Sequence, residues 1–135
     1  MLNAQTYQRL VSAKLFIDEN FNDQITLEQI SAKAFLSPFH FHRLFKSVYK
    51  KTPQQYLMQK RIEKAKELLA KEGISITDVC DMVGYESLAS FSLLIKKHNG
   101  HSPQYYRNIA WLKKQLQKEQ PKRFIPHCFA ETFNL

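Results

Sequence analysis

The chain has 135 residues, of which 44% are hydrophobic, enough to build the core of one ordinary domain or of two very small ones. Its formal net charge of +8 favours polyanionic partners such as nucleic acid or an anionic membrane. Two cysteines exclude a disulfide framework, and because neither a membrane-spanning apolar run nor a signal-peptide pattern occurs, we expect a cytoplasmic protein.

The spacing of the apolar residues predicts an all-α chain of about seven helices joined by short connections. The first three helices are indicated by Leu10, Leu15 and Phe16, by Leu27, Ile30 and Ala34, and by Phe41, Leu44, Phe45 and Val48. A long fourth helix is expected from 53 to about 70, with an inward face of Tyr56, Leu57, Ile62, Ala65 and Leu69 and a stop at Gly73. The last three are expected at 76–83, at 88–97 and from 103 to about 117.

The two halves of the chain repeat the same helix signals. Residues 26–30 match 75–79, and each of these segments begins with a hydroxyl residue followed three positions later by an amide or carboxylate, as in a capping box. Further on, Ser37 matches Ser87, and Thr-Pro at 52–53 matches Ser-Pro at 102–103. The spacing between matched residues of the two halves changes by one in the turn between the paired helices. The first half has Phe35 there and the second has Gly84, a difference that allows the two turns to differ in backbone geometry.

A short helix, a tight turn and a helix of about ten residues are typical of a helix-turn-helix unit, whose second helix enters the major groove of DNA. We expect one such subdomain at 7–51, a linker helix at 52–72, a second subdomain at 73–110, and a helical extension with an apolar tail at 111–135. If the linker is stiff, the two recognition helices lie about 34 Å apart, which is one turn of DNA.

The sequence resembles the DNA-binding domain of the AraC/XylS family over roughly residues 7 to 109. The motifs that carry the resemblance are Leu-x-x-Ile-Ser at 27–31, Leu-Ser-Pro at 36–38 with Arg-Leu-Phe-Lys at 43–46, Val-Gly-Tyr-Glu-Ser at 83–87 with Phe91, and Ser-Pro-x-x-Tyr-Arg at 102–107. The resemblance implies two homeodomain-like helix-turn-helix subdomains bridged by a long helix, binding in adjacent major grooves, and usually activation of transcription. Within the family, the chain is similar to the single-domain members, which sense no ligand themselves.

In the first recognition helix we expect the core-facing residues to leave Phe39, His42, Arg43 and Lys46 exposed to DNA. Arg43 is suited to bidentate pairing with guanine, His42 to donation to a base or phosphate, and Phe39 to packing on a thymine methyl group. The alternatives are that Arg43 and Lys46 are solvated charges and that Phe39 belongs to the core.

In the second recognition helix the corresponding outward positions are Ala89, Ser90 and Leu93, whose natural targets are thymine methyl groups. Lys46, Lys96, Lys97 and the helix starts at Ser37 and Ser87 are candidates for phosphate contacts. The family usually has an arginine, an aromatic two residues later and then a lysine here, whereas this chain has Leu-Leu-Ile-Lys at 93–96. We therefore expect the first unit to dominate specificity. The alternative to a base contact by Leu93 is that this residue belongs to the core.

Neither a metal site nor a catalytic site is predicted, and no cofactor is expected. The five histidines lack the partners and spacings of a zinc site, and no phosphate loop, nucleophile elbow or isolated carboxylate pair occurs. Some DNA-repair methyltransferases carry AraC-like domains, and the reactive cysteine of these enzymes sits in a Pro-Cys-His motif. This chain has Pro126-His127-Cys128, a different order, so Cys128 is interpreted as inert.

The sequence thus predicts a non-enzymatic, sequence-specific regulator that binds double-stranded DNA as a monomer and contacts RNA polymerase. The alternative is a protein-interaction module of the same fold that binds polymerase or another regulator. The apolar tail, residues 120–135, is expected either to pack on the domain or to dock another subunit or polymerase.

Overall fold

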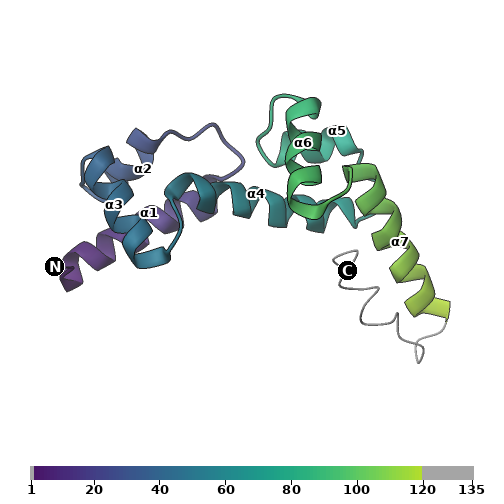
Figure 1. Cartoon of the computed structure of the whole chain (residues 1–135), viewed down its shortest axis with the longest axis horizontal. Coiled ribbons are helices and arrows are strands. Elements are labelled where there is room, and N and C mark those ends of the chain that lie inside the picture. Colours follow the sequence, from purple (N-terminus) through teal and green to yellow (C-terminus); the bar gives the residue numbers. More distant parts are fainter. Residues whose placement is uncertain (1, 120–135) are drawn as a thin grey trace. The chain divides into compact units, whose positions relative to one another are not determined.

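The computed structural model describes residues 2–119, and this part of the chain is entirely helical (Figure 1). The seven helices are α1 (Ala4–Asn20), α2 (Leu27–Lys33), α3 (Pro38–Tyr49), α4 (Pro53–Leu69), α5 (Ile76–Met82), α6 (Leu88–Asn99) and α7 (Pro103–Glu119). The predicted fold class and the predicted number of helices are confirmed. The apolar tail and Cys128 lie outside the described residues.

The helix lengths repeat along the chain, as the sequence repeat does. Helices α1, α4 and α7 each have 17 residues, α2 and α5 have 7, and α3 and α6 have 12. The chain forms two compact units that divide inside α4, between Glu63 and Lys64. Helix α4 therefore closes the first unit and opens the second. The finer division of the chain at 52 and 73 stays a prediction.

The core of the first unit is built by α1, α2, α3 and the start of α4. Its buried members are Leu10, Ala13, Ile17, Ile30, Ala34, Phe41 and Phe45, with Tyr56 and Leu57 of α4 packed against them. Leu15, one of the apolar residues that indicated this helix, does not face the core, since its side chain is 50% exposed. Two residues after Ala13, it lies about 200° around the helix, opposite the buried face.

The second unit repeats this core. Ala65, Leu68 and Leu69 of α4 pack with Val79 and Cys80 of α5, with Val83 at the end of that helix, and with Phe91 and Ile95 of α6. In α4 the spacing of Ile62, Ala65 and Leu69 equals that of the buried residues of α1, so both helices bury the same kind of face. Burial, followed by the nearby Asp81 charge, raises the pKa of the Cys80 thiol, whose Sγ donates to the Tyr85 carbonyl at 3.4 Å.

Hydroxyl side chains begin most of the helices, as predicted. Thr26 and Gln29 form a complete capping box at α2, and Thr52 and Gln55 form the same two bonds, at 3.1 and 2.9 Å, at α4. At α5, Ser75 Oγ accepts from the amide of Asp78 at 3.0 Å, which is one of the two bonds expected. These bonds satisfy amides that would otherwise lack partners at the helix starts.

The two helix-turn-helix turns have the same geometry, although their sequences differ. Phe35 and Gly84 both have positive φ, 55° and 90°, and each amide donates to a carbonyl three residues earlier at 3.1 Å. A β-branched or bulky residue rarely adopts this left-handed conformation. In the first unit the Arg9 guanidinium lies 5.4 Å from the centroid of the exposed Phe35 ring. The one-residue difference in length between the two units falls in the connection between the paired helices, before the caps at Ser37 and Ser87, as predicted.

The end of α4 is capped by α7 within the second unit. Arg107, which is 6% exposed, donates from Nε to the Leu69 carbonyl at 2.9 Å, and Lys114 Nζ donates to the Ala70 carbonyl. The guanidinium of Arg107 also lies 5.4 Å from the ring centroid of Trp111. Cations at a helix C-terminus satisfy its free carbonyls and interact favourably with its dipole, so Arg107 holds α7 against α4.

Candidate nucleic-acid interface

Helices α3 and α6 are built alike at both ends. Ser37 Oγ accepts from the amide of His40, and Ser87 Oγ accepts from the amide of Ser90, each at 3.2 Å. The residues that end the two helices, Lys50 and Gly100, have left-handed φ values of 61° and 79°. Neither helix contains an Asp or Glu, although the chain has twelve. Both helices therefore lack fixed negative charge that would repel a polyanion.

One face of α3 is buried and the opposite face is exposed. Phe41 and Phe45 enter the core, whereas Arg43 and Lys46 are exposed and Phe39 is 73% exposed. The alternative that Phe39 is a core residue is therefore wrong. The guanidinium carbon of Arg43 lies 5.7 Å from the centroid of the Phe39 ring, so the two side chains predicted to contact bases lie together on this face.

The two histidines of α3 differ in exposure. His42, which the sequence assigned to base contacts, is half-buried, and His40, interpreted only as a surface residue, is exposed. With an offset of 50, His40 matches the predicted base-contacting residue Ser90, whereas His42 matches Ser92, which is also half-buried. The repeat therefore indicated that His40 lies on the exposed face of α3, and the assignment of base-contacting residues from the sequence missed it.

The exposed face of α6 carries no charge in its first turns. Phe91 and Ile95 are buried, and Leu88, Ala89, Ser90 and Leu93 are exposed. Leu93 is 70% exposed, so the alternative that it belongs to the core is wrong. It lies three and four residues after Ser90 and Ala89, and these positions share a helix face.

The predicted phosphate-binding residues are all exposed. Lys46, Lys96 and Lys97 lie in the last turns of α3 and α6, and the hydroxyls of Ser37 and Ser87 cap the starts of these helices. A capping hydroxyl uses its oxygen as an acceptor for the helix and keeps its own proton to donate. Both helix starts therefore keep a hydroxyl donor beside the positive end of the helix dipole.

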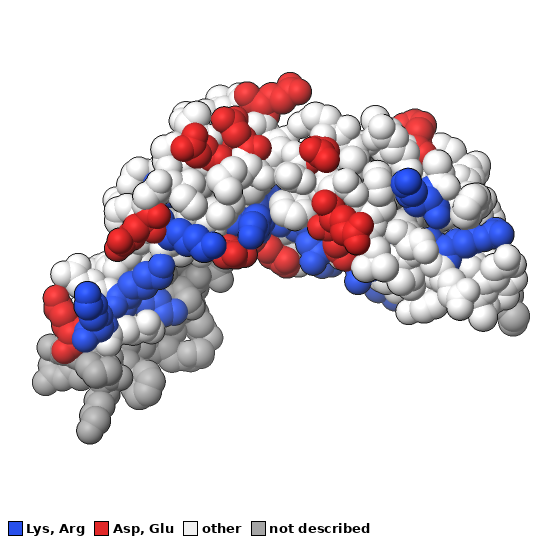
Figure 2. Space-filling model, turned by 180° about the vertical axis from the view of Figure 1, so that it is seen from behind, with Lys and Arg blue, Asp and Glu red and all other residues white. Residues whose placement is uncertain are grey.

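Several cations on α4 are engaged within their own unit. In the first unit Lys60 pairs with Asp18 at 3.6 Å, and Arg61 donates to the carbonyls of Phe21 and Asp23. In the second unit the hydrogen bond and charge of Lys64 hold the pKa of the Glu67 carboxyl below its ordinary value. On the face shown in Figure 2, basic and acidic side chains accordingly lie side by side. Part of the positive charge on α4 is thus balanced by nearby carboxylates.

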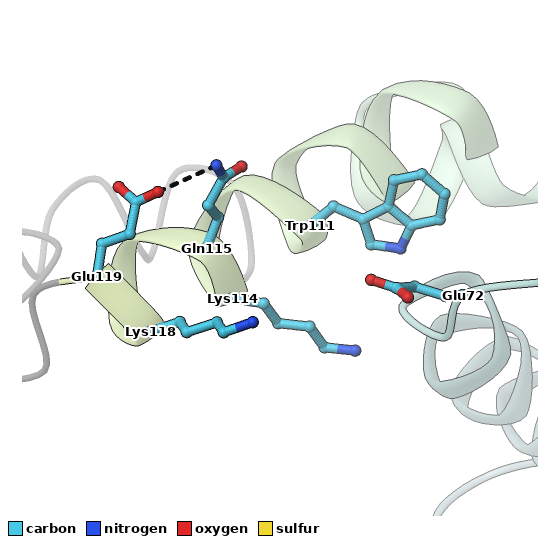
Figure 3. Close-up of a pocket in the computed structure, with 6 residues that line it drawn as sticks. All are labelled: Glu72, Trp111, Lys114, Gln115, Lys118 and Glu119. Atoms are coloured by element: carbon cyan, nitrogen blue, oxygen red, sulfur yellow. Dashed lines mark hydrogen bonds between the residues drawn. The ribbon is translucent and has the colours of Figure 1, made fainter.

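A hollow of about 580 Å³ lies beside α7 in the second unit (Figure 3). Its lining includes Glu72, Trp111, Lys114, Gln115, Lys118 and Glu119, and Gln115 Nε2 donates to the Glu119 carboxylate at 3.2 Å. The side chains of α7 in this view belong to successive turns of one helix and carry charges of both signs. They resemble a solvated helix face more than a set of catalytic groups.

Within residues 2–119, no group of three or more His, Cys, Asp or Glu side chains is arranged to hold a metal ion. No helix among these residues is long and apolar enough to cross a membrane.

Residues 30–109 match the family described as helix-turn-helix domain. The chain belongs to this AraC-type family of DNA-binding domains of transcription regulators. AdaA of Bacillus subtilis, a bifunctional transcriptional activator and DNA repair enzyme, is 34% identical over 70% of the chain, which covers 45% of AdaA. PqrA of Proteus vulgaris, a probable transcription factor, is 31% identical over 64% of the chain and 70% of its own length. The resemblance to the AraC/XylS family is confirmed.

A solved structure has the same fold. The C-terminal domain of the response regulator YesN of Fusobacterium nucleatum superposes with a TM-score of 0.67 at 34% identity, covering 70% of this chain and 93% of that domain. The chain spans 45%, 37% and 33% of the lengths of the relatives AdaA, LumQ and RafR. The similarity to these three proteins therefore concerns a part of each.

Proposed function

We propose that this chain is a sequence-specific transcriptional activator, without enzymatic activity, that inserts α3 and α6 into adjacent major grooves of double-stranded DNA. The observation that carries the proposal is a pair of twelve-residue helices, equally capped, free of acidic residues and exposed on the face opposite the core. An α-helix fits the major groove, and a helix-turn-helix unit presents its second helix there.

In this proposal the first unit supplies most of the sequence specificity. Arg43 pairs with the N7 and O6 acceptors of a guanine, and Phe39 packs on a neighbouring thymine methyl group. The contact between the two side chains in the free protein supports a joint role, because the ring orders the guanidinium before DNA arrives. His42 donates to a base or a phosphate from the edge of the same face.

The remaining partners follow from the same arrangement. Lys46, Lys96, Lys97 and the hydroxyls of Ser37 and Ser87 contact phosphates and fix the register on the duplex. One chain carries two recognition helices, so it binds DNA as a monomer, and activation requires a contact with RNA polymerase. Chromosomal DNA as the target places the protein in the cytoplasm.

Selection from a random DNA library, followed by sequencing and a salt titration on the selected site, tests the proposal. We expect two boxes one helical turn apart. With on the order of six to ten phosphate contacts, affinity falls by about 10³ or more between 50 and 200 mM salt. A flat salt response, or a library that yields no enriched sequence, would overturn the proposal.

Two variants separate the proposed roles. Arg43→Ala is expected to lose about 1–3 kcal/mol of discrimination at one base position. Lys97→Ala is expected to weaken binding to all sequences alike and to reduce the salt slope by about 1. Both side chains are exposed, so neither change is expected to affect folding.

The exposed Leu93 favours a second candidate, a protein-interaction module that binds polymerase or another regulator through α6. This candidate predicts no enrichment from the DNA library together with a stable complex between the chain and purified polymerase. It also predicts that Leu93→Ala breaks that complex, whereas Arg43→Ala does not.

A further inference from the structure

Helix α6 presents an apolar contact where α3 presents a cation. With the repeat offset of 50, Leu93 occupies the position of Arg43, and Ala89 occupies that of Phe39. The caps at both ends of the two helices agree, and the buried pair Phe91 and Ile95 repeats Phe41 and Phe45. Position 93 is therefore placed on its helix as position 43 is on α3, but with a side chain that forms no hydrogen bond.

The residues around Leu93 leave it as the most prominent group of this face. Ala89 and Ser90, one turn before it, have short side chains, and Lys96 and Lys97, one turn after it, carry the positive charges of the helix end. All of these positions are exposed. On such a face, the lysines are suited to the phosphate backbone, and the leucine stands between them and the capped start of the helix.

The floor of the major groove offers one apolar group to such a side chain. Guanine and adenine present acceptors and a donor there, cytosine presents an amino donor, and thymine adds the methyl group on C5. A leucine gains nothing from a hydrogen-bonding edge, but it removes apolar surface from water when it packs on that methyl group. The same methyl group occurs at the same ring position in 5-methylcytosine.

We propose that Leu93 contacts the C5 methyl group of a pyrimidine in the second half of the binding site. This inference rests on the proposed function and deepens it. The second box then selects thymine because of its methyl group, and at that position 5-methylcytosine binds better than cytosine. The first box, contacted through Arg43, responds instead to the guanine edge.

The test uses the selected operator with four pyrimidines placed in turn at each thymine of the second box: thymine, uracil, 5-methylcytosine and cytosine. Two comparisons, thymine with uracil and 5-methylcytosine with cytosine, change only the methyl group and keep the base pair's hydrogen bonds. Burying one methyl group is expected to change affinity about fourfold. At one position we expect this gain in both comparisons.

Leu93→Ala is the decisive variant, and Leu112→Ala, which truncates an exposed leucine of α7, is its matched control. We expect Leu93→Ala to abolish both methyl effects while keeping the preference for the first box, and Leu112→Ala to keep both. Far-ultraviolet circular dichroism checks that each variant is as helical as the wild type.

Three results would overturn the inference: a selected second box without thymine, equal affinity for the methylated and unmethylated probes at every position, or a methyl effect that persists in Leu93→Ala. In each case binding to the first box and the salt dependence survive, so the proposed function stands. Failure of the proposed function is distinct, because no operator would then be enriched at all.

Discussion

Replacing Arg107 tests whether a basic residue of this DNA-binding chain acts on folding rather than on DNA. Its Nε donates to the Leu69 carbonyl at 2.9 Å, and hydrogen bonds from charged donors contribute about 1.5–3 kcal/mol. Its contact with the ring of Trp111, a partly exposed side chain, adds about 0.5–1 kcal/mol. Arg107→Ala is therefore expected to lower the free energy of unfolding of the second unit by about 2–4 kcal/mol.

The lower end of this range is favoured by one feature of the site. Arg107 Nη2 is buried and has no hydrogen-bond partner among the described residues, so the desolvation of the guanidinium offsets part of the gain. Arg107→Met keeps most of the buried volume and removes the charge together with the bond. Its loss of stability is expected to be smaller than that of Arg107→Ala.

The assay is urea unfolding followed by the emission of Trp111, the one tryptophan of the chain, which lies in α7. Below the transition, DNA binding by Arg107→Ala is expected to keep the wild-type salt slope, whereas Lys97→Ala lowers it. A loss below about 1 kcal/mol, or a reduced salt slope in Arg107→Ala, would refute the structural role derived for this residue.

Three further changes probe caps, turns and a buried thiol. Thr52→Ala removes one bond of the α4 capping box and should cost about 1 kcal/mol in a thermal melt followed by circular dichroism, whereas an unchanged melting temperature would contradict the cap. Gly84→Ala puts a side chain at φ 90° and should cost about 1–2 kcal/mol, with Gly84→Asn, which tolerates this conformation better, losing less. Because burial raises the pKa of Cys80, its contribution is complete below the ordinary thiol pKa and is lost as pH rises through the raised value. In the Cys128→Ser background, the urea midpoint should fall between pH 7 and 10, and adding Cys80→Ala should remove part of this fall. Identical pH profiles with and without Cys80→Ala would contradict the raised pKa of Cys80.

Local signals were sufficient to predict the helices, because the residues that cap a helix lie within a few positions of its ends in the sequence. Thr26, Thr52 and Ser75 are acceptors for amides three positions along, and such bonds can be inferred from sequence alone. The inward face of α1 was harder to predict. Leu15 is as apolar as Leu10, and only the packing of α2 and α3 against Leu10, Ala13 and Ile17 decides which stripe is buried.

The turn at Phe35 could not be predicted for a different reason. A phenylalanine at positive φ opposes the preference of its own backbone, and it is held there by the tertiary structure on both sides. Leu36 donates to the Ser31 carbonyl at 3.3 Å, as Tyr85 does to the Cys80 carbonyl at 3.1 Å. These bonds close the same turn in both units, so the fold imposes on phenylalanine a conformation that glycine adopts freely.

The candidate site was predicted in part because burial and exposure follow the helix period, whereas contacts between side chains do not. The period placed Phe41 inside and Arg43 outside, but the stacking of Arg43 on Phe39 depends on rotamers that no periodicity specifies. The role of Arg107 was also missed, since a basic residue near the end of a DNA-binding motif is as easily assigned to phosphate as to a carbonyl of α4. Its partner lies 38 residues away in the chain, beyond the reach of local patterns.

The separation of buried from exposed positions explains how one fold carries two unlike contact surfaces. In α3 and α6 the core uses positions 41 and 45 and their counterparts 91 and 95, and none of these is exposed. A change at 43 or 93 therefore alters no buried contact, and surface substitutions away from caps and core usually cost less than about 0.5 kcal/mol. Stability places almost no constraint on the outward face, so the difference between Arg43 and Leu93 is free to reflect what each helix is proposed to bind.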